Sequence, residues 1–397
     1  MWLFLGGIVL LFYTAIDIYT GIRFAGLVRY FFPSLRAFIF WPLYVLFTYS
    51  FILILLLRLD RVYFLRQAAM YSLPFLLYFF LGLLAADGVR LGLRLLSRVS
   101  ASSGFSAAGT GIALGLSVLA MIYGTFHAQD IRTAHYDIIL NKSGSQSGAA
   151  SPLRIALISD LHIGVTVGRE WTARIVDAVN GTRPDIICIA GDIFDNDVGA
   201  VKDLDGVAAE LRRLKAPLGV YACPGNHDVD RMSLSSLRDG AVLDRIHDFL
   251  KKADITFLED SVELVADRFY LAGRRDASVR RSGARQERES AAALAAGLDK
   301  SRPIIFMDHQ PVDFPREDEA GVDLILSGHT HRGQFFPVNI VTACIYKKAG
   351  AVSYGYWRGR SAQGIVSSGA GVWGPPIRIG TASEVAVVDI KFGDGAY

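Results

Sequence analysis

The chain has 397 residues, 52% of them hydrophobic, and a formal net charge of +3 at pH 7. This length predicts two or three domains, and the apolar content is too high for an ordinary soluble enzyme. The near-neutral charge and the lack of a long basic run exclude nucleic acid as the expected partner.

Most of the apolar residues lie in the first 126 positions. Three stretches there carry no charge and a fourth contains only Asp17. Each is close to the ~20 residues that cross a bilayer as a helix. The four stretches are residues 2–22, 37–57, 67–86 and 104–126. Residues 1–126 are therefore predicted to form a membrane anchor of four transmembrane helices, with membrane lipid as a partner.

The basic residues between these stretches leave the orientation nearly balanced. One group favours the first and third loops inside the cell, and a second group favours the opposite. The first group is Arg23, Arg29, Arg36, Arg90, Arg94 and Arg98, and the second is Arg58, Arg61, Arg66, Arg132 and Lys142. The uncharged amino terminus tips the balance slightly toward an external carboxy-terminal domain, with the cytoplasmic side as the alternative.

Residues 127–397 alternate between strand and helix patterns and are expected to form one domain. Apolar runs bounded by turn residues predict strands, and helical periodicity separates the first of them. The strands are expected at 136–140, 154–159, 185–190, 218–223, 304–307 and 324–327, and the helices at 169–180, 202–214 and 234–252. This order predicts an α/β sheet with both faces covered.

Two other features carry no defined chemistry. The three cysteines, Cys188, Cys223 and Cys344, lack a paired metal spacing and are expected to be buried free thiols. Residues 278–299 hold four arginines without apolar periodicity, which predicts a solvated excursion, with a lid over the substrate as the alternative.

Five of the eight histidines lie in an ordered set of short motifs, each following a predicted strand. Alone, each motif is a common turn or capping pattern, but five in order are not expected by chance. Side chains at the carboxyl ends of neighbouring strands converge on one crevice, and carboxylate, amide and imidazole groups there can hold two divalent metals. The motifs are Asp160-Leu161-His162, Gly191-Asp192-Ile193-Phe194-Asp195, Gly225-Asn226-His227-Asp228, Asp308-His309 and Gly328-His329-Thr330-His331.

This ordered set resembles the calcineurin-like metallophosphoesterase superfamily from about Ile131 to the end of the chain. The segments 158–162 and 328–334 are similar to a bacterial membrane-associated branch, near enzymes that cleave the pyrophosphate of UDP-2,3-diacylglucosamine. The resemblance implies an α/β domain of two packed β-sheets flanked by helices, following the transmembrane helices. Together with the four predicted transmembrane helices, it implies a multi-pass protein of the cell (inner) membrane.

Carried over by position, the resemblance implies a two-metal site. Asp160, His162 and His331 would bind one metal, Asn226, His309 and His329 the other, and Asp192 would bridge them. Mn, Fe and Zn all suit such ligands, with Mn favoured. The sequence departs from the family pattern at Arg332, where glycine is usual, and in the longer segment 141–152. Neither departure removes a ligand.

The expected chemistry is hydrolysis by metal-activated hydroxide. Two cations sharing Asp192 would lower the pKa of a bridging water and stabilise an in-line phosphoryl displacement. His227 follows a ligand and is expected to protonate the leaving oxygen or to stabilise negative charge. Asp195 is expected to orient His227 and to favour its protonated form, with Asp228 as a second candidate for that task.

The expected function is that of a membrane-bound phosphoesterase. A site next to a bilayer meets lipid phosphoesters at high local concentration, which favours a lipid-linked phosphoester or pyrophosphate substrate. One alternative is a tethered phosphodiesterase for soluble nucleotides. Another is a transporter or sensor with a regulatory hydrolase-like module, although the spans contain little polar lining and all seven ligands are present. The exact substrate, the native metal and the oligomeric state stay open.

Overall fold

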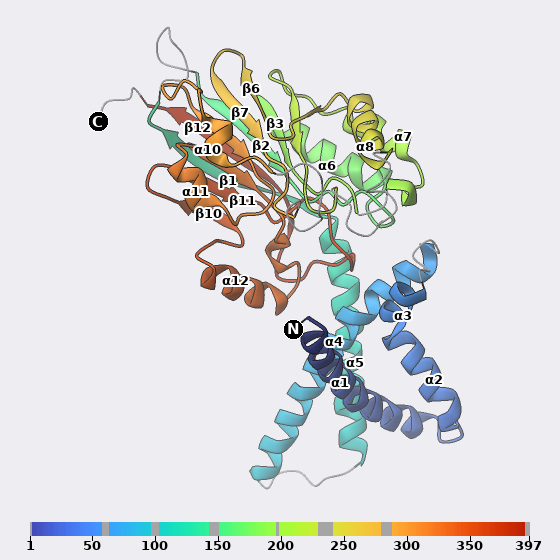
Figure 1. Cartoon of the computed structure of the whole chain (residues 1–397). Helices are drawn as coiled ribbons and strands as arrows, with labels where there is room; N and C mark the ends of the chain where they lie inside the picture. The colour runs from blue at the N-terminus through green and yellow to red at the C-terminus, as the bar shows by residue number, and fades with distance from the viewer. Residues whose placement is uncertain are drawn as a thin grey trace. The chain divides into compact units, whose positions relative to one another are not determined.

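Figure 1 shows the computed structural model of the chain, coloured from blue at the amino terminus to red at the carboxyl terminus. The structure describes residues 2–57, 63–96, 103–142, 151–195, 198–228, 241–278 and 288–393. The chain divides into two compact units, Met1–Phe126 with Gly374–Pro376, and His127–Trp373 with Ile377–Tyr397. Arg58, Arg61 and Arg98, three of the arginines that bear on the membrane orientation, lie outside the described residues.

The first unit is helical. Its helices are α1 (Trp2–Phe31), α2 (Ala37–Thr48), α3 (Ser50–Leu57), α4 (Tyr63–Leu95) and α5 (Ser103–Ala128). Among the described residues, α1, α4 and α5 are long and apolar enough to cross a membrane. The expected span at 37–57 is divided at Tyr49, whose φ of −91° and ψ of 2° leave the helical range. Three of the four expected spans are thus continuous helices, and the fourth consists of two shorter ones.

A partly buried polar contact joins α1 to α4. Arg23 forms an ion pair with Asp87, and the Tyr19 hydroxyl donates a hydrogen bond to Asp87 Oδ2 at 2.6 Å. Arg23, expected in a loop, therefore lies inside α1, and its charge is neutralised by a carboxylate on the neighbouring helix.

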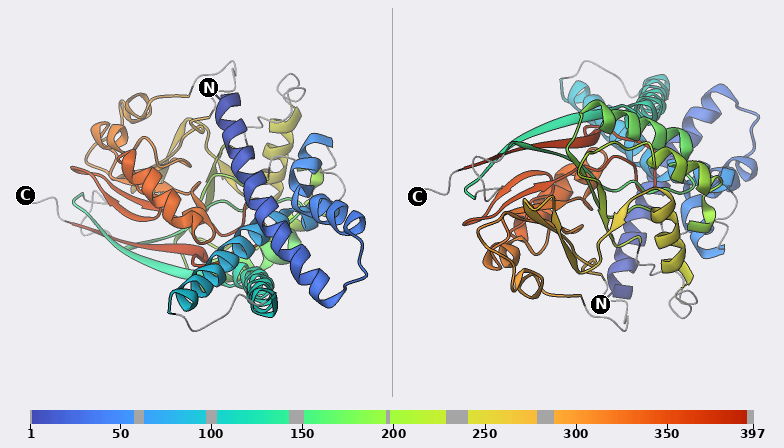
Figure 2. Two further views of the ribbon diagram at one scale, coloured as in Figure 1. Left: turned by 90° about the horizontal axis from the view of Figure 1, so that it is seen from below. Right: turned by 90° about the horizontal axis from the view of Figure 1, so that it is seen from above.

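The second unit contains two six-stranded sheets (Figure 2). The first sheet has the order β1 (Ile131–Leu140), β12 (Ser383–Phe392), β2 (Leu153–Ile158), β3 (Ile186–Ala190), β4 (Val220–Cys223) and β5 (Thr256–Phe257). The second has the order β10 (Gly355–Arg358), β11 (Gln363–Val366), β9 (Leu324–Ser327), β8 (Ile304–Met307), β7 (Phe269–Gly273) and β6 (Ser261–Val265).

Alternating side chains explain how the sheets pack. Leu153, Ile155 and Leu157 of β2 lie in a buried core shared with the second sheet. Ala156 and Ile158 point the other way, into a core formed with helices. The outer face of the first sheet is covered by α6 (Arg169–Gly181), α7 (Leu204–Leu211) and α8 (Ala241–Lys252), and that of the second by α10 (Ala291–Ala295) and α11 (Phe314–Glu319). The expected architecture of two packed sheets flanked by helices is confirmed.

Some elements differ from the expected ones, either because strand pairing sets where they begin or because they are too short to show a periodic pattern. β1 begins at Ile131 rather than at residue 136, because it pairs in parallel with β12 from Ile131 to Leu140. The short strands β5, β6, β7 and β10 and the helices α10 and α11 were not predicted, since a few residues carry little periodicity. The expected helix at 234–252 is confirmed as α8 over its described part, Ala241–Lys252, and residues 229–240 lie outside the described residues.

Parallel pairing positions the functional motifs. β2, β3 and β4 run parallel in the first sheet, as do β7, β8, β9 and β11 in the second. Each histidine motif follows directly on the carboxyl end of one of these strands, and parallel strands end at the same edge of a sheet.

Candidate metal centre

Backbone hydrogen bonds hold the motif loops against one another. The Asp160 amide donates to the Gly191 carbonyl and the His162 amide to the Asp192 carbonyl, each at 3.0 Å. The Gly328 amide donates to the His309 carbonyl at 3.0 Å. These bonds hold the motif loops together, and five of the seven expected ligands, Asp160, His162, Asp192, His309 and His331, are buried.

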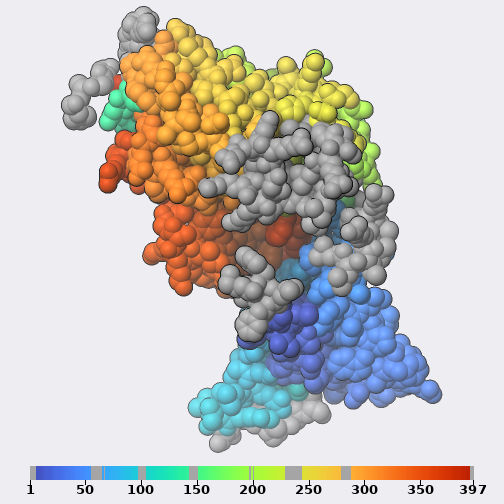
Figure 3. All heavy atoms as spheres, viewed as in Figure 1, coloured from blue at the N-terminus to red at the C-terminus, as the bar shows by residue number. Residues whose placement is uncertain are grey.

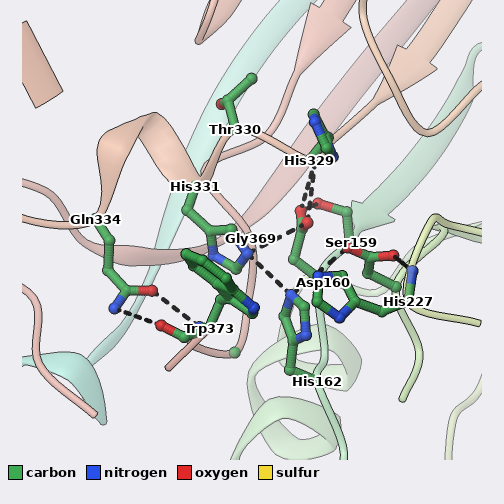
Figure 4. Close-up of polar contacts among 12 residues, drawn as sticks. Ser159, Asp160, His162, His227, His329, Thr330, His331, Gln334, Gly369 and Trp373 are labelled. Atoms are coloured by element: carbon green, nitrogen blue, oxygen red, sulfur yellow. Dashed lines mark hydrogen bonds and ion pairs between the residues drawn. The ribbon is translucent and has the colours of Figure 1, made fainter. Parts of the chain in front are cut away.

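The first group of ligands is Asp160, His162 and His331 (Figure 4). The Nε2 atoms of His162 and His331 are 3.0 Å apart, and His331 Nε2 lies 3.5 Å from Asp160 Oδ1. Burial lowers the pKa of His162 to about 4 and that of His331 well below its ordinary value. Both rings are then neutral, and two nitrogen atoms with lone pairs at this separation fit a shared cation.

The second group is Asp192, His309 and His329, with Asn226 beside it. His309 Nε2 lies 3.0 Å from Asp192 Oδ2 and 3.2 Å from Asn226 Oδ1. The other ring nitrogen, His309 Nδ1, lies 2.8 Å from the Ala190 carbonyl and can donate to it. A hydrogen bond of this kind holds a metal-binding imidazole in a fixed orientation.

Asp192 lies between the two groups. Its Oδ2 atom is 3.0 Å from His309 Nε2 and 3.6 Å from His162 Nε2. Burial raises the pKa of this carboxyl, but the electrostatic interaction and hydrogen bond with His309, together with the interactions with His162 and His227, more than offset burial, so the pKa lies well below its ordinary value. The carboxylate is therefore charged and within reach of ligands from both groups, as a bridging ligand must be.

Two motif glycines allow this close packing. A Cβ atom on Gly225 would lie 2.2 Å from Asp192 Oδ1, and one on Gly328 would lie 2.4 Å from Asp160 Oδ2. Any larger residue would collide with a carboxylate of the site, so the glycines are required for close approach of the backbone.

The backbone of the ligand residues is strained. Asp160, His162, Asp192, His329 and His331 have φ values of 52°, 46°, 51°, 72° and 49°. Left-handed backbone at residues other than glycine costs roughly 1 to 3 kcal/mol each and persists only where the surroundings enforce it. The strain is concentrated at the site, where it directs the side chains toward one another.

The three residues expected to act in catalysis have different surroundings. His227 Nδ1 and His162 Nδ1 each lie 4.0 Å from Asp195 Oδ1, so Asp195 lies close to both rings. His227 also lies within ligand distance of His162 and Asp192. Asp228 accepts hydrogen bonds from the amides of Ile193, Phe194 and Gly225. Its carboxylate thus joins two motif loops, and no contact between the described residues links it to the His227 ring.

A buried network of ion pairs surrounds Asp308, the residue before His309. Arg274 Nη1 is 2.8 Å from both Asp308 Oδ2 and Glu317 Oε1, and Arg288 pairs with Asp308. Arg288, expected in a solvated excursion, has a side chain that is only 5% exposed. That expectation is wrong for Arg288, because the buried Asp308 carboxylate attracts a cation from a distant segment. Arg280, Arg281 and Arg285 lie outside the described residues.

Sequence patterns missed two residues beside the site. Trp373 is 53% exposed, and its ring lies 6.1 Å from that of His227. Arg378 is fully buried and donates to the carbonyls of Ser368 at 2.7 Å, Gly371 at 2.8 Å and His331 at 3.2 Å. Burial lowers the pKa of Arg378 to about 10. The small residues 367–371, which follow β11, were the available signal for a loop of close approach.

Arg332 is exposed and lies over the ring of Tyr354, with its guanidinium carbon 4.2 Å from the ring centre. This cation–π contact holds the Arg332 side chain at the edge of the site, next to His331 in the sequence.

Comparison with known proteins finds related sequences. The family described as calcineurin-like phosphoesterase matches residues 153–333. A Danio rerio protein named transmembrane protein with metallophosphoesterase domain is 30% identical over 313 residues, covering 76% of this chain and 68% of the relative. An uncharacterized metallophosphoesterase of Aquifex aeolicus is 29% identical, covering 70% and 98%. One of Helicobacter pylori strain J99 is 32% identical, and the chain spans only 58% of its length.

Solved structures show weaker similarity. A 5′-nucleotidase precursor from Thermus thermophilus is 16% identical with a TM-score of 0.34, covering 61% of this chain and 54% of that protein. A dimetal phosphatase from Danio rerio is 17% identical with a TM-score of 0.30, covering 55% and 87%. Such scores are too low to support an inference about activity. The family match and the Danio rerio relative show that the chain belongs to the calcineurin-like metallophosphoesterases.

Proposed function

We propose that this enzyme hydrolyses a phosphoester or pyrophosphate bond of a lipid-linked substrate at the membrane, using two divalent cations. The observation that carries the two-metal proposal is the position of the Asp192 carboxylate within 3.6 Å of ring nitrogens from both ligand groups. In this proposal Asp160, His162 and His331 hold one cation, Asn226, His309 and His329 the other, and Asp192 both.

The donor atoms suit Mn, Fe or Zn, and Mn is the proposed native metal. Bound cations would supply a water of lowered pKa and would stabilise the charge that develops on the phosphoryl oxygens. The imidazole of His227 would protonate the leaving oxygen. Asp195, 4.0 Å from His227 Nδ1, would favour the protonated form of that ring through its charge, while Asp228 would keep the loop of His227 in place.

Two observations support a lipid-linked substrate. Three helices among the described residues are long and apolar enough to span a membrane, and a relative is named as a transmembrane protein. An enzyme attached to a bilayer meets lipid phosphoesters at a high effective concentration. UDP-linked diacylglucosamine belongs to this substrate class if the domain faces the cytoplasm, and polyprenyl or phospholipid phosphoesters belong to it if the domain lies outside.

A substrate panel tests the proposal. The purified full chain, loaded in turn with Mn, Zn and Fe, is incubated with phospholipids, polyprenyl pyrophosphate, UDP-diacylglucosamine and soluble nucleotides, with Asp192→Asn as the inactive control. We expect the highest kcat/KM for one of the lipids. Turnover of the nucleotides alone would reject the lipid substrate and favour a tethered nucleotide phosphodiesterase.

In the proposed orientation, the catalytic domain lies on the external side of the inner membrane. A reporter that is active only outside the cytoplasm, fused after Tyr397, should then be active. Activity of a cytoplasm-only reporter at the same position would reverse the orientation and would favour a nucleotide-linked lipid precursor as substrate.

A further inference from the structure

Helix α12 (Val338–Lys348) lies on the surface of the catalytic domain (Figure 3). None of its residues, all of which the structure describes, is buried. Ile340, Val341 and Ile345 are 52%, 55% and 60% exposed. A helix of a soluble domain normally buries such residues, whereas these three side chains are left exposed by the part of the chain that the structure describes.

Helix α12 turns its more polar side toward the domain and its apolar side outward, which is the reverse of the usual arrangement in a soluble domain. Asn339, Thr342 and Tyr346 are partly buried and, at spacings of three and four, share the face toward the domain. Ile340, Val341, Cys344 and Ile345 lie on the remaining surface and are exposed. The expectation of a buried Cys344 is wrong for this reason: the helix packs through its polar face.

The helix is rigidly attached beside the metal centre. It follows η4 (His331–Gly333), which carries a proposed ligand. A Cβ atom on Gly333 would lie 2.5 Å from the Asn339 backbone, so the two segments are in close contact. The Asn339 amide donates to the Phe335 carbonyl at 3.1 Å, and the Phe336 amide to the Ile379 carbonyl at 2.8 Å.

We infer that α12 is an interfacial helix that docks on the lipid bilayer, with Val341 and Ile345 among the acyl chains. The last turn carries Lys347 and Lys348, whose charges complement anionic headgroups at the boundary of the apolar face. A bilayer is the partner that the rest of the chain favours, because the described part of the other unit contains three candidate spans. The docking needs no assumption about the substrate.

The docking also gives the proposed function a route for its substrate, and this part rests on that function. Since α12 adjoins His331, a docked helix holds the centre close to the headgroup region. A lipid phosphate can then reach the site without leaving the membrane.

The native Cys344 allows a direct test. Cys188 and Cys223 are buried, so a maleimide carrying an environment-sensitive fluorophore reacts at Cys344 in the folded protein. The labelled full chain is reconstituted in phosphatidylcholine vesicles with and without phosphatidylglycerol, and with or without doxyl-labelled lipid. We expect blue-shifted emission that the doxyl lipid quenches, most strongly with phosphatidylglycerol. Lys347→Glu with Lys348→Glu should weaken docking by about fivefold per lysine.

Matched variants make the result specific. Val341→Glu should abolish the quenching and reduce turnover of a lipid substrate in vesicles, while turnover of a soluble aryl phosphodiester stays unchanged. A fluorophore on Ile139→Cys in a Cys344→Ser background, at an exposed position of β1, should not be quenched. Equal quenching at both positions would overturn the inference.

Two further outcomes separate this inference from the proposed function. A blue-shifted probe that doxyl lipid does not quench would show that protein covers α12, and would overturn the inference even if lipids are hydrolysed. Quenching together with hydrolysis of soluble substrates alone would leave the docking intact and reject the lipid substrate.

Discussion

The side-chain amide of Gln334 holds the backbone of Trp373 with two hydrogen bonds. Gln334 Nε2 donates to the Trp373 carbonyl at 3.0 Å, and the Trp373 amide donates to Gln334 Oε1 at 2.9 Å. Gln334 follows the proposed ligand His331, and the Trp373 ring lies against His227 (Figure 4). The pair thus connects a metal-binding loop to the ring proposed as the proton donor.

Replacing Trp373 tests this connection. Trp373→Ala removes an edge-to-face ring contact worth about 0.5 to 1.5 kcal/mol, so kcat/KM should fall about 2- to 12-fold. Trp373→Phe should retain most of the activity. Gln334→Leu should resemble Trp373→Ala, because it releases the same backbone. Steady-state kinetics on one substrate measures all three, and a fully active Trp373→Ala would show that the ring does not restrain His227.

Metal content tests the role of Asp192. Asp192→Asn should lower the bound metal measured by elemental analysis and abolish activity, because an amide is a weaker ligand for two cations than a carboxylate. Asn226→Ala should lose less total metal, since it removes a ligand of one site. Asp389→Asn, which breaks a partly exposed pair with Arg154, is the control and should keep its metal. Full occupancy in Asp192→Asn would contradict the bridging role.

His227 separates catalysis from metal binding. His227→Ala should retain both metals and lower kcat by about 10² to 10⁴-fold, the usual contribution of a positioned acid. Asp195→Asn should show a smaller loss of the same kind. Both losses should shrink for an aryl phosphodiester, whose leaving group needs little protonation. Because His227 also lies within ligand distance of Asp192, loss of metal from His227→Ala would instead assign it to the metal shell.

Arg378 should contribute to stability through the loop that it holds. Arg378→Met leaves the carbonyl groups of His331, Ser368, Gly369 and Gly371 without their charged donor, which should lower the free energy of unfolding by about 3 kcal/mol or more. Arg378→Lys keeps the positive charge but has fewer hydrogen-bond donors, so it should recover part of the lost stability. Arg213→Met, at a half-exposed pair with Asp177, should change the stability by about 1 kcal/mol or less. Thermal unfolding of the three variants measures the difference.

Asp318 gives a pH dependence with a defined sign. Although burial raises its pKa, hydrogen bonds from Ser361 and from the amides of Arg360 to Ala362 lower it to about 2. A carboxyl with a lowered pKa stabilises the folded state above its ordinary pKa, and this stabilisation disappears as the pH falls from about 4 to about 2. Asp318→Asn should therefore have a smaller loss of stability over this range than the parent chain in acid unfolding curves. Parallel curves would show that the charge contributes nothing.

The sequence alone determined the elements whose evidence is local. Apolar runs that are long enough to cross a bilayer and carry at most one charge mark α1, α4 and α5. Shorter apolar runs mark β2, β3, β8 and β9, because both faces of these strands are covered. The identities and the order of the proposed ligands were also visible, since each follows a strand. The fold class implies that these strands pair in parallel, and parallel pairing brings the proposed ligands to the same edge of the sheets.

Only the tertiary structure decided what depends on partners distant in the sequence. Asp228 was only a second candidate for orienting His227, and the sequence does not show that its carboxylate accepts hydrogen bonds from the amides of Phe194 and Gly225. Arg288 looked solvent-exposed until the fold placed the buried Asp308 beside it. For α12, composition alone does not say which side packs on the domain. The contact of Asn339 with Gly333 decides that, and it leaves the apolar side exposed.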